Sequence, residues 1–597
     1  MSPGGAGDGR PGRITAFWAA RRARWTLPLV IIVIIILVAT IDHIGAHRIS
    51  QVDAPIVSDL VATHGGSATV TLDRPWDGFN PDTPGGADSS TPTLLSNVLP
   101  SAFSVAPTLA PTLNANLLQS VEVTATTPLT IQYVINPAAV WSDGVPVTAE
   151  DFIYAWRSQR GGGLDVDHQP DQAASTLGYR NVASVTGSHH GKTVTVVFST
   201  PFTDWRLLFS GMVPAHVAER VGWNHGFDTF NPAVDLSAGP FVVTSVSPDG
   251  TAVLSRNPRW WGPKAVLRQV SVRATSAPST GTWTGELATT NRSVIQPSAF
   301  SVGTMAAVSA LPNTESAVSP SLSFLQLEFD TTSPTTSPLA VRQAIAHAID
   351  RSSLLSDTFG AIDPSLQVSE DHLAVPSQQD YQASSASAEY DAPAPAAVDR
   401  LLASVGFHRS AAGPYVDAAG SPLVVRMAVE SGNPWVTQVG AAVAAQLQAA
   451  GISVVTMPVD GPTGLAAANV ASGYDLALVT RTASTYLTAT IGWYSDDLGP
   501  AGTNGSANWS NFEDPDVDQQ FAVAAKDLNP VTGASVYGQI DDVLWDRMVA
   551  LPLFAEPTLV ANGVQVANVV ANPSPSGLLW NLPLWSTLIP RPSHPAG

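Results

Sequence analysis

The stretch from Val140 to Trp156 constrains the fold more than any other part of the chain. It reads Val-Trp-Ser-Asp-Gly-Val-Pro-Val-Thr-Ala-Glu-Asp-Phe-Ile-Tyr-Ala-Trp. Ser142-Asp143-Gly144 is typical of a turn, because glycine adopts a positive φ at no steric cost. Thr148 is suited to the N-cap of a helix, and Asp151, three residues later, completes a near capping box. The stretch therefore predicts a strand, a turn and a helix with a largely apolar face.

The composition bounds the class of protein. The chain has 597 residues, a length from which we predict about two to four domains. Hydrophobic residues make up 44% and charged residues 13%, which indicates a packed core. A net charge of −20 repels nucleic acid, so no nucleic-acid partner is expected. The chain has no cysteine, which excludes disulfides, thiolate nucleophiles and cysteine zinc sites.

The N-terminal residues have the pattern of an export or anchor segment. Residues 1–26 are rich in Gly, Pro and Arg, and residues 27–44 are almost wholly apolar. The apolar run lies at the short end of the roughly 17–25 residues of a transmembrane helix, and its length also suits a signal-peptide h-region. Because Ile44-Gly45-Ala46 is a poor cleavage motif, we favour an uncleaved anchor. Either interpretation leaves the basic tail in the cytoplasm and exports the rest.

Two further helices are marked by periodicity and caps. Val341, Ile345 and Ile349 lie four residues apart and predict one buried stripe, in a helix opened by Ser337-Pro338. Asn433-Pro434 predicts the start of another helix, and Gly451 its end. Strands are expected at residues 68–72, 121–135, 193–198 and 452–455, and residues 382–397 are expected to form a mobile loop.

Motifs that would carry catalytic or metal chemistry are weak. Residues 187–193 approach a phosphate-binding loop, but the spacing is one residue short and a strand follows, which favours a hairpin turn. Residues 165–171 start like a calcium loop, yet Pro170 occupies the place of the required glycine. His43 and His47 have the spacing of a zinc pair without the glutamate between them. We therefore predict no enzymatic activity, no metal and no cofactor.

The Val140–Trp156 stretch resembles the "W-S-D-G-x-P-x-T-A-E-D-F-x-Y-x-W" segment of the family 5 extracellular solute-binding proteins, the peptide- and nickel-binding components of ABC importers. Residues 341–351 resemble that family's "V-R-Q-A-(L/I)-x-x-A-I-D-R" segment. The resemblance covers roughly residues 63–590. Within the family, the chain looks most like the LpqW-type envelope proteins of actinobacteria, as residues 205–210, 214–217 and 222–227 indicate.

This resemblance implies an α/β fold: a two-lobed periplasmic-binding-protein clamshell with an extra subdomain, preceded here by an N-terminal transmembrane helix. Lobe I would comprise residues 63–95, 238–316 and 556–590. The extra subdomain would be residues 96–237, and lobe II residues 317–555. The chain would cross between the lobes near residues 316–320 and 553–558.

The resemblance also implies a set of ligand-binding residues, for each of which ordinary packing is the competing interpretation. Those in the first lobe are Trp76, Phe79 and Asn80, and those in the second are Tyr486, Trp493, Tyr494 and Trp509. The family's peptide binders usually carry an Asp that pairs with the free amine of the ligand. Residues 481–488 contain no acid, although Asp496 and Asp497 follow. Recognition of an ordinary peptide N-terminus is therefore in doubt.

The function that this implies is a membrane-tethered, extracytoplasmic solute-binding protein. It would capture a peptide or another extended solute for an ABC permease, with a monomeric ectodomain. The alternative is a repurposed member of the family that acts as a scaffold or regulator in cell-envelope assembly. The missing acid and the lack of a lipid-anchor cysteine favour that alternative. The two hypotheses differ in the cleft, which would be closable and aromatic in an importer component and filled in a scaffold.

Overall fold

The computed structural model describes residues 60–590, except 276–277, 298, 379–380, 412 and 496–506. The expected basic tail and apolar segment, with His43 and His47, lie outside the described residues, as do Asp496 and Asp497. Within the described ranges, no helix combines the length and apolar character needed to cross a membrane.

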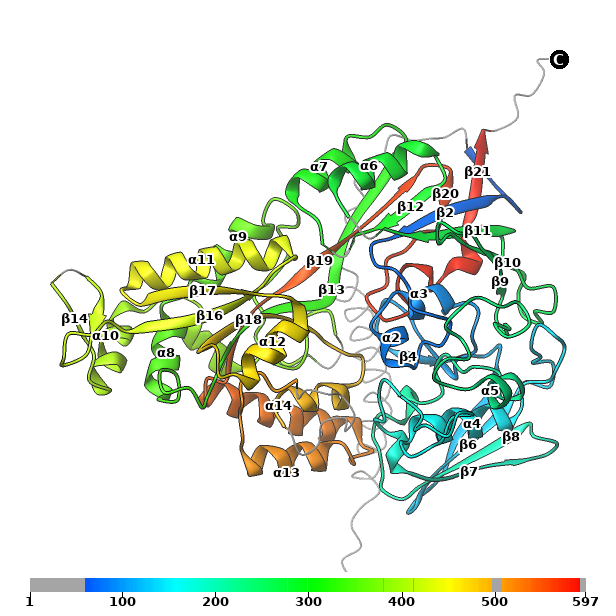
Figure 1. The fold of residues 1–597 in the computed structure, drawn as a ribbon, viewed down its shortest axis with the longest axis horizontal. Coiled ribbons are helices and arrows are strands. Elements are labelled where there is room, and N and C mark those ends of the chain that lie inside the picture. The colour runs from blue at the N-terminus through cyan, green and yellow to red at the C-terminus, as the bar shows by residue number, and fades with distance from the viewer. Residues whose placement is uncertain are drawn as a thin grey trace, which may run out of the picture. The chain divides into compact units, whose positions relative to one another are not determined.

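A mixed ten-stranded sheet organises the chain (Figure 1). Its strands, in spatial order, are β17 (Ser453–Val459), β16 (Val424–Glu430), β18 (Leu476–Thr482), β13 (Thr314–Phe329), β19 (Ala550–Gly563), β12 (Ser293–Gln296), β2 (Ser67–Leu72), β11 (Gln269–Ala274), β10 (Ala252–Arg256) and β9 (Phe241–Val246). Strands β11, β2 and β12 run parallel, as do β17, β16 and β18. The long antiparallel pair β13–β19 joins these two parallel groups.

The register of the β13–β19 pair is interrupted between Pro320 and Phe324. This irregularity adjoins the residues where the sequence predicts the chain to cross between lobes. The lobe boundaries given above remain a prediction.

Four smaller sheets complete the strands. The four-stranded sheet has the order β5 (Leu118–Thr126), β6 (Leu129–Ile135), β8 (Thr193–Phe198) and β7 (Val182–Ser188). The three-stranded sheet has the order β1 (Leu60–Thr63), β21 (Ser586–Pro590) and β20 (Val566–Ala567). The two remaining sheets are the pairs β3 (Phe103–Val105) with β4 (Pro111–Leu113), and β14 (His408–Arg409) with β15 (Tyr415–Val416).

The described residues also form α-helices and short 3-10 helices. The α-helices are α2 (Pro84–Ala87), α3 (Thr91–Leu95), α4 (Ala149–Gln159), α5 (Ala215–Val221), α6 (Thr280–Thr289), α7 (Val302–Ser309), α8 (Leu339–His347), α9 (Arg351–Phe359), α10 (Pro395–Ser404), α11 (Pro434–Ala450), α12 (Gly461–Val470), α13 (Pro515–Ala524) and α14 (Pro530–Asp546). The 3-10 helices are η1 (Tyr179–Asn181), η2 (Trp205–Leu207), η3 (Ser385–Tyr390), η4 (Leu487–Trp493), η5 (Gly577–Leu579) and η6 (Leu582–Leu584).

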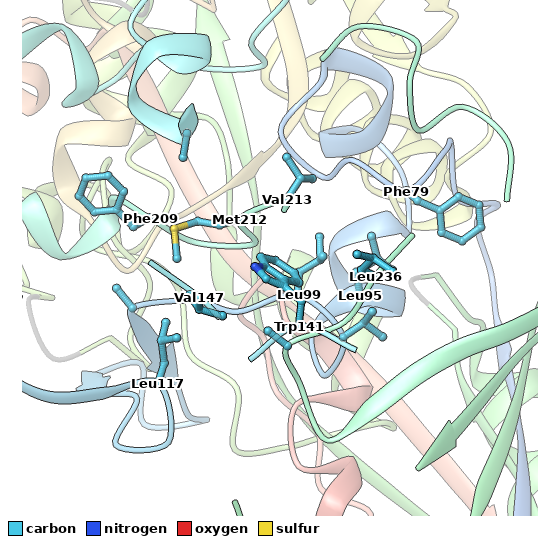
Figure 2. Close-up of a cluster of buried hydrophobic side chains, with 14 of the residues drawn as sticks. Phe79, Leu95, Leu99, Leu117, Trp141, Val147, Phe209, Met212, Val213 and Leu236 are labelled. Atoms are coloured by element: carbon cyan, nitrogen blue, oxygen red, sulfur yellow. The ribbon is translucent and has the colours of Figure 1, made fainter. Parts of the chain in front are cut away.

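Buried apolar side chains form two main regions. The first core gathers around β2, β9–β11 and the four-stranded sheet, and it includes Trp141, Phe152 and Phe209 (Figure 2). The second core comprises the clusters packed on β13, β16, β18 and β19. Both cores lie on the same large sheet, which connects them through β13 and β19.

The turn and the helix of the Val140–Trp156 stretch form as the sequence predicts, whereas the expected strand is reduced to an isolated bridge between Val140 and Pro146. Helix α4 begins after Thr148, whose hydroxyl accepts a hydrogen bond from the Glu150 N–H, while Asp151 Oδ2 accepts from the Thr148 N–H at 2.8 Å. The other oxygen of Asp151 accepts from the N–H of Ala215 at 3.0 Å. The capping carboxylate thereby also fixes the first turn of α5.

Two local predictions need correction. Helix α8 has Pro338 rather than Ser337 at its N-cap, and no side chain caps it. Residues 385–390 form the helix η3 instead of a loop. Tyr390 explains the difference, because its ring is buried and stacks on Trp545 with the ring centroids 5.9 Å apart. That packing overrides the loop-forming composition of the segment.

Candidate functional site

The two cores touch at a junction formed by residues 203–206 of the first and residues 486–488 and 525 of the second. The Asp204 carboxylate accepts hydrogen bonds from the Thr488 N–H at 3.0 Å and from its hydroxyl at 2.7 Å. The Tyr486 hydroxyl donates to the Arg206 carbonyl at 3.1 Å. The Thr203 N–H donates to the Ala525 carbonyl at 2.9 Å. These bonds join segments about 280 to 320 residues apart in the sequence.

A second contact between the cores comes from the β3–β4 hairpin. Phe103 and Leu113 of this hairpin pack against the first core. Leu109, at its tip, is instead buried in the second core, in the cluster that contains Phe324 and Leu487. The strands of the hairpin therefore contact the first core, and its tip lies in the second.

Beside the junction, the second core presents an aromatic wall around a buried ion pair. Arg481, at the end of β18, donates through Nε to Glu328 Oε1 of β13 at 2.6 Å, and its Nη2 lies 2.5 Å from the same oxygen. The guanidinium carbon lies 4.1 Å from the ring centroid of Trp509 and 5.1 Å from that of Trp493. Both charged side chains are almost wholly buried, and the rings shield the pair from water.

The pair leaves polar atoms unsatisfied. Glu328 Oε2 and Gln326 Nε2 are buried and have no hydrogen-bond partner among the described residues, and the same holds for Ser495 Oγ. The Tyr494 hydroxyl donates to Gln326 Oε1 at 3.2 Å. Burial raises the pKa of Glu328, and the charge of Arg481 opposes that rise. Because a buried unpaired polar atom is costly, this wall favours a polar group against it.

The structure brings the four expected second-lobe residues to one region. Trp493 and Trp509 contact Arg481, Tyr494 contacts the neighbouring Gln326, and Tyr486 lies at the junction. Their role in ligand binding remains a prediction.

The three expected first-lobe residues lie elsewhere. Phe79 is buried in the first core and packs on Phe230, with the ring centroids 5.7 Å apart (Figure 2). Asn80 is buried and donates to the Trp223 carbonyl at 3.2 Å. Trp76 packs against the same core. The described contacts of these three residues are with the first core, and their role in ligand binding also remains a prediction.

Sequence reasoning missed Leu109, Asp204, Gln326 and Glu328. The last two could have been found, because they occupy alternate positions in the otherwise apolar run from Phe324 to Phe329. A buried strand that carries two polar residues on one face indicates a polar partner. Nothing local marks Asp204 or Leu109, since both make their contacts with distant segments.

The weak metal and phosphate motifs have structural roles. Residues 187–193 form the β7–β8 hairpin. The buried Asp165 carboxylate accepts from the N–H groups of Trp223 and Asn224 at 2.7 and 3.0 Å, so it braces a loop. In the described part of the chain, no group of three or more His, Asp or Glu side chains is arranged to hold a metal ion.

Comparison with curated proteins finds mycobacterial relatives. The oligopeptide-binding protein OppA of Mycobacterium tuberculosis (strain ATCC 25618 / H37Rv) is 27% identical over 512 residues, which cover 83% of this chain and 80% of OppA. The probable monoacyl phosphatidylinositol tetramannoside-binding protein LpqW of the same strain is 32% identical over 211 residues, 34% of this chain and 32% of LpqW.

Solved structures share the fold. The periplasmic EDTA-binding protein EppA superposes with a TM-score of 0.79 at 24% identity, over 88% of this chain and 97% of EppA. The oligopeptide-binding protein AppA of Bacillus subtilis, in complex with a nonapeptide, superposes with a TM-score of 0.68 at 16% identity, over 88% of this chain and 100% of AppA. The predicted α/β fold of two-domain periplasmic binding proteins is thus confirmed. Residues 112–511 match the description "Bacterial extracellular solute-binding proteins, family 5 Middle". The chain belongs to the family 5 bacterial extracellular solute-binding proteins.

Proposed function

We propose that this protein captures a peptide or another extended solute between its two cores and delivers it to an ABC permease. The observation that carries the proposal is the junction itself. Asp204 and Tyr486 belong to different cores, and each makes a hydrogen bond to the other core beside the aromatic wall. A solute that lies on the wall would be enclosed when these contacts form.

The proposed mechanism is hinge closure of the two cores as lobes of a clamp. The strands β13 and β19 run between them, and an interrupted register between Pro320 and Phe324 is a suitable place for bending. The division into lobes at residues 316–320 and 553–558 is part of this proposal. Closure would exclude water, which strengthens every polar contact between the wall and the solute.

The chemistry of the wall favours neutral polar groups of the solute. Arg481 is already neutralised by Glu328, so the wall offers no spare charge of either sign there. The unpartnered Gln326 Nε2, a donor, and Glu328 Oε2, an acceptor, are buried in this structure, so the proposal is that they pair with an amide or a hydroxyl of the solute when the wall opens to admit it. Trp493 and Trp509 would contact the apolar part of the solute. This argument supports backbone and side-chain recognition over capture of a free ammonium group.

We propose further that the protein is exported and held at the outer face of the membrane by its apolar N-terminal segment, as a single-pass anchor. The sequence of residues 1–44 supports this part of the proposal. The ABC permease partner is inferred from the family. A lipoprotein of Mycobacterium leprae, 27% identical over 77% of this chain, suggests membrane association by a related route.

The alternative of an envelope scaffold is not favoured. The local resemblance to LpqW covers about a third of either chain, whereas the resemblance to OppA extends over four fifths of both.

The experiment that tests the proposal is a binding assay on the full chain in mild detergent. Native mass spectrometry would look for a co-purified solute. Pools of peptides of two to ten residues would then be added while tryptophan emission and the melting temperature are followed. Saturable binding raises the melting temperature, because only the folded state binds. Trp509→Leu should weaken that binding, and Trp260→Leu, at a half-exposed tryptophan that packs on Trp261, should not. No co-purified mass and no shift with any pool would refute the proposal.

A further inference from the structure

The helix η4 begins at the junction without a cap of its own. Its N-cap residue, Tyr486, provides no side-chain hydrogen bond to the first turn. The N–H groups of a first helical turn have no partner within the helix and need an external acceptor. Here the acceptor of the Thr488 N–H is the Asp204 carboxylate of the first core, at 3.0 Å. One core therefore supplies the cap of a helix that belongs to the other.

The position of η4 gives this cap a consequence for the aromatic wall. The helix ends at Trp493, which lies against Arg481, and Tyr494 follows directly. Because η4 is a short 3-10 helix, it has few internal hydrogen bonds to hold it. An acceptor at its N-terminus therefore has a large share in fixing the two aromatic side chains.

Leu109 has a backbone conformation that also depends on the second core. Its φ is +61°, a left-handed value that is rare for a branched aliphatic residue. Its N–H donates to the Ala106 carbonyl at 2.8 Å and closes a tight turn. The side chain is 4% exposed and lies in the apolar cluster that contains Leu487, the first residue of η4. Burial against the second core offsets the cost of this conformation.

We propose that closure of the clamp completes η4, with Asp204 as its N-cap and Leu109 packed beside its first turn. Asp204 and Leu109 are thus positioning residues: they act on the solute through Trp493 and Tyr494 and do not themselves need to touch it. Closure and ordering of the aromatic wall are then a single event. This inference rests on the proposed clamp, and its test does not require an identified solute.

The first test is hydrogen exchange of the full chain, followed by mass spectrometry of the segment 486–494. Asp204→Ala should raise exchange in that segment about tenfold, the factor that corresponds to the loss of a helix cap. Asp204→Asn should restore protection, because an amide oxygen caps a helix about as well as a carboxylate oxygen. Asp228→Ala, which removes a surface carboxylate of the first core that pairs with His225, is the matched control.

The second test measures closure directly. The chain has no cysteine, so a dye pair can be attached through Thr186→Cys on β7 and Gln519→Cys on α13, both exposed. Energy transfer between the dyes reports the ratio of closed to open molecules. Leu109→Ala should lower this ratio roughly tenfold, as expected for the loss of a buried leucine contact. Leu113→Ala, in the same hairpin but packed on the first core, should leave the ratio unchanged.

The inference is overturned if Asp204→Ala exchanges at the wild-type rate in residues 486–494. It is equally overturned if exchange rises to the same extent in β6 and β8, because the effect is then general loss of stability. A failure here with peptide binding intact would leave the proposed function standing. If Asp204→Ala raises exchange in residues 486–494 but no peptide pool binds, the coupling of closure to η4 is supported and the proposed transport function is refuted.

Discussion

The buried pair Arg481–Glu328 should be strongly coupled, and its disruption tests the description of the aromatic wall. Arg481→Met removes the cation and leaves the Glu328 carboxylate without its ionic partner in a fully buried place. The change keeps an unbranched side chain of similar length between Trp493 and Trp509. The effect expected is therefore mainly electrostatic.

The magnitude follows from burial. Breaking a buried ion pair on one side typically costs about 3–5 kcal/mol, because the remaining charge has lost its compensation. Glu328 can escape part of this cost by taking up a proton. Burial already raises its pKa, and Arg481→Met removes the charge that opposes the rise. The native state of the variant then binds a proton that the unfolded state releases above about pH 4.5, so its stability falls as pH rises. The penalty should be larger at pH 8 than at pH 5.

The assay is urea unfolding of Arg481→Met, Glu328→Leu and the double variant at both pH values. The double variant should recover most of the loss, since replacing both partners by apolar groups is often neutral. Arg157 and Glu219, an exposed pair at 3.0 Å, provide the control, with single changes costing about 0–1 kcal/mol. A penalty for Arg481→Met as small as this control, or one independent of pH, would refute the reasoning.

Three further changes have defined outcomes. Burial raises the pKa of Glu556 to about 7, so the native state holds a proton above the unfolded value of 4.5, and stability worth about 3 kcal/mol is lost as pH rises from 4.5 through 7. Glu556→Gln should therefore gain stability over the wild type at pH 8 compared with pH 5. If the difference in unfolding free energy between variant and wild type were the same at both pH values in urea unfolding, the prediction would be wrong. Thr148→Ala should cost about 1 kcal/mol in the same titration, whereas Thr148→Ser should retain the cap. Arg351 is fully buried and donates to the carbonyls of Ser369 and Pro552, so Arg351→Lys should cost about 2–4 kcal/mol because an ammonium cannot reproduce the fork. A loss below about 0.5 kcal/mol for Arg351→Lys would show that the fork is unimportant.

Local signals predicted the parts of the fold that depend on neighbours in the sequence. The capping box at Thr148 forms because both its partners lie within three residues. Val341 and Ile345 are buried because helical period places them on one face of α8, whereas Ile349, also buried, lies beyond the end of that helix at His347. Asn433 caps α11, which ends before Gly451 at φ +92°. In each case the physical cause acts over a few residues.

Contacts made between distant segments could not be predicted in this way. The Ala- and Ser-rich segment 382–397 has the composition of a loop. It nevertheless forms η3, because Tyr390 stacks on Trp545, which lies about 150 residues away in the sequence. Phe79 is aromatic, but its position in the chain does not reveal that its ring packs on Phe230, about 150 residues away. The sequence identifies candidate aromatic and loop residues, but the residues that they contact are known only from the fold.

The same distinction bears on how the missing acid should be interpreted. From the sequence alone, the lack of a carboxylate in residues 481–488 looks like the loss of a ligand contact. In the structure, a carboxylate does reach this segment, but it comes from Asp204 and binds the protein's own Thr488. Asp204 is therefore committed to joining the two cores, while Arg481 is neutralised within the second core by Glu328. Both of these charges are thus engaged by the protein itself, whereas Asp496 and Asp497 lie outside the described residues. If the proposed solute binds at Trp493 and Trp509, we expect recognition through its amides, hydroxyls and apolar side chains, so blocking the N-terminus of a bound peptide by acetylation should leave its affinity within about twofold. A loss of more than about tenfold on acetylation in the tryptophan emission assay would mean that the site retains an acid for the free amine, and the interpretation of Asp204 would have to change.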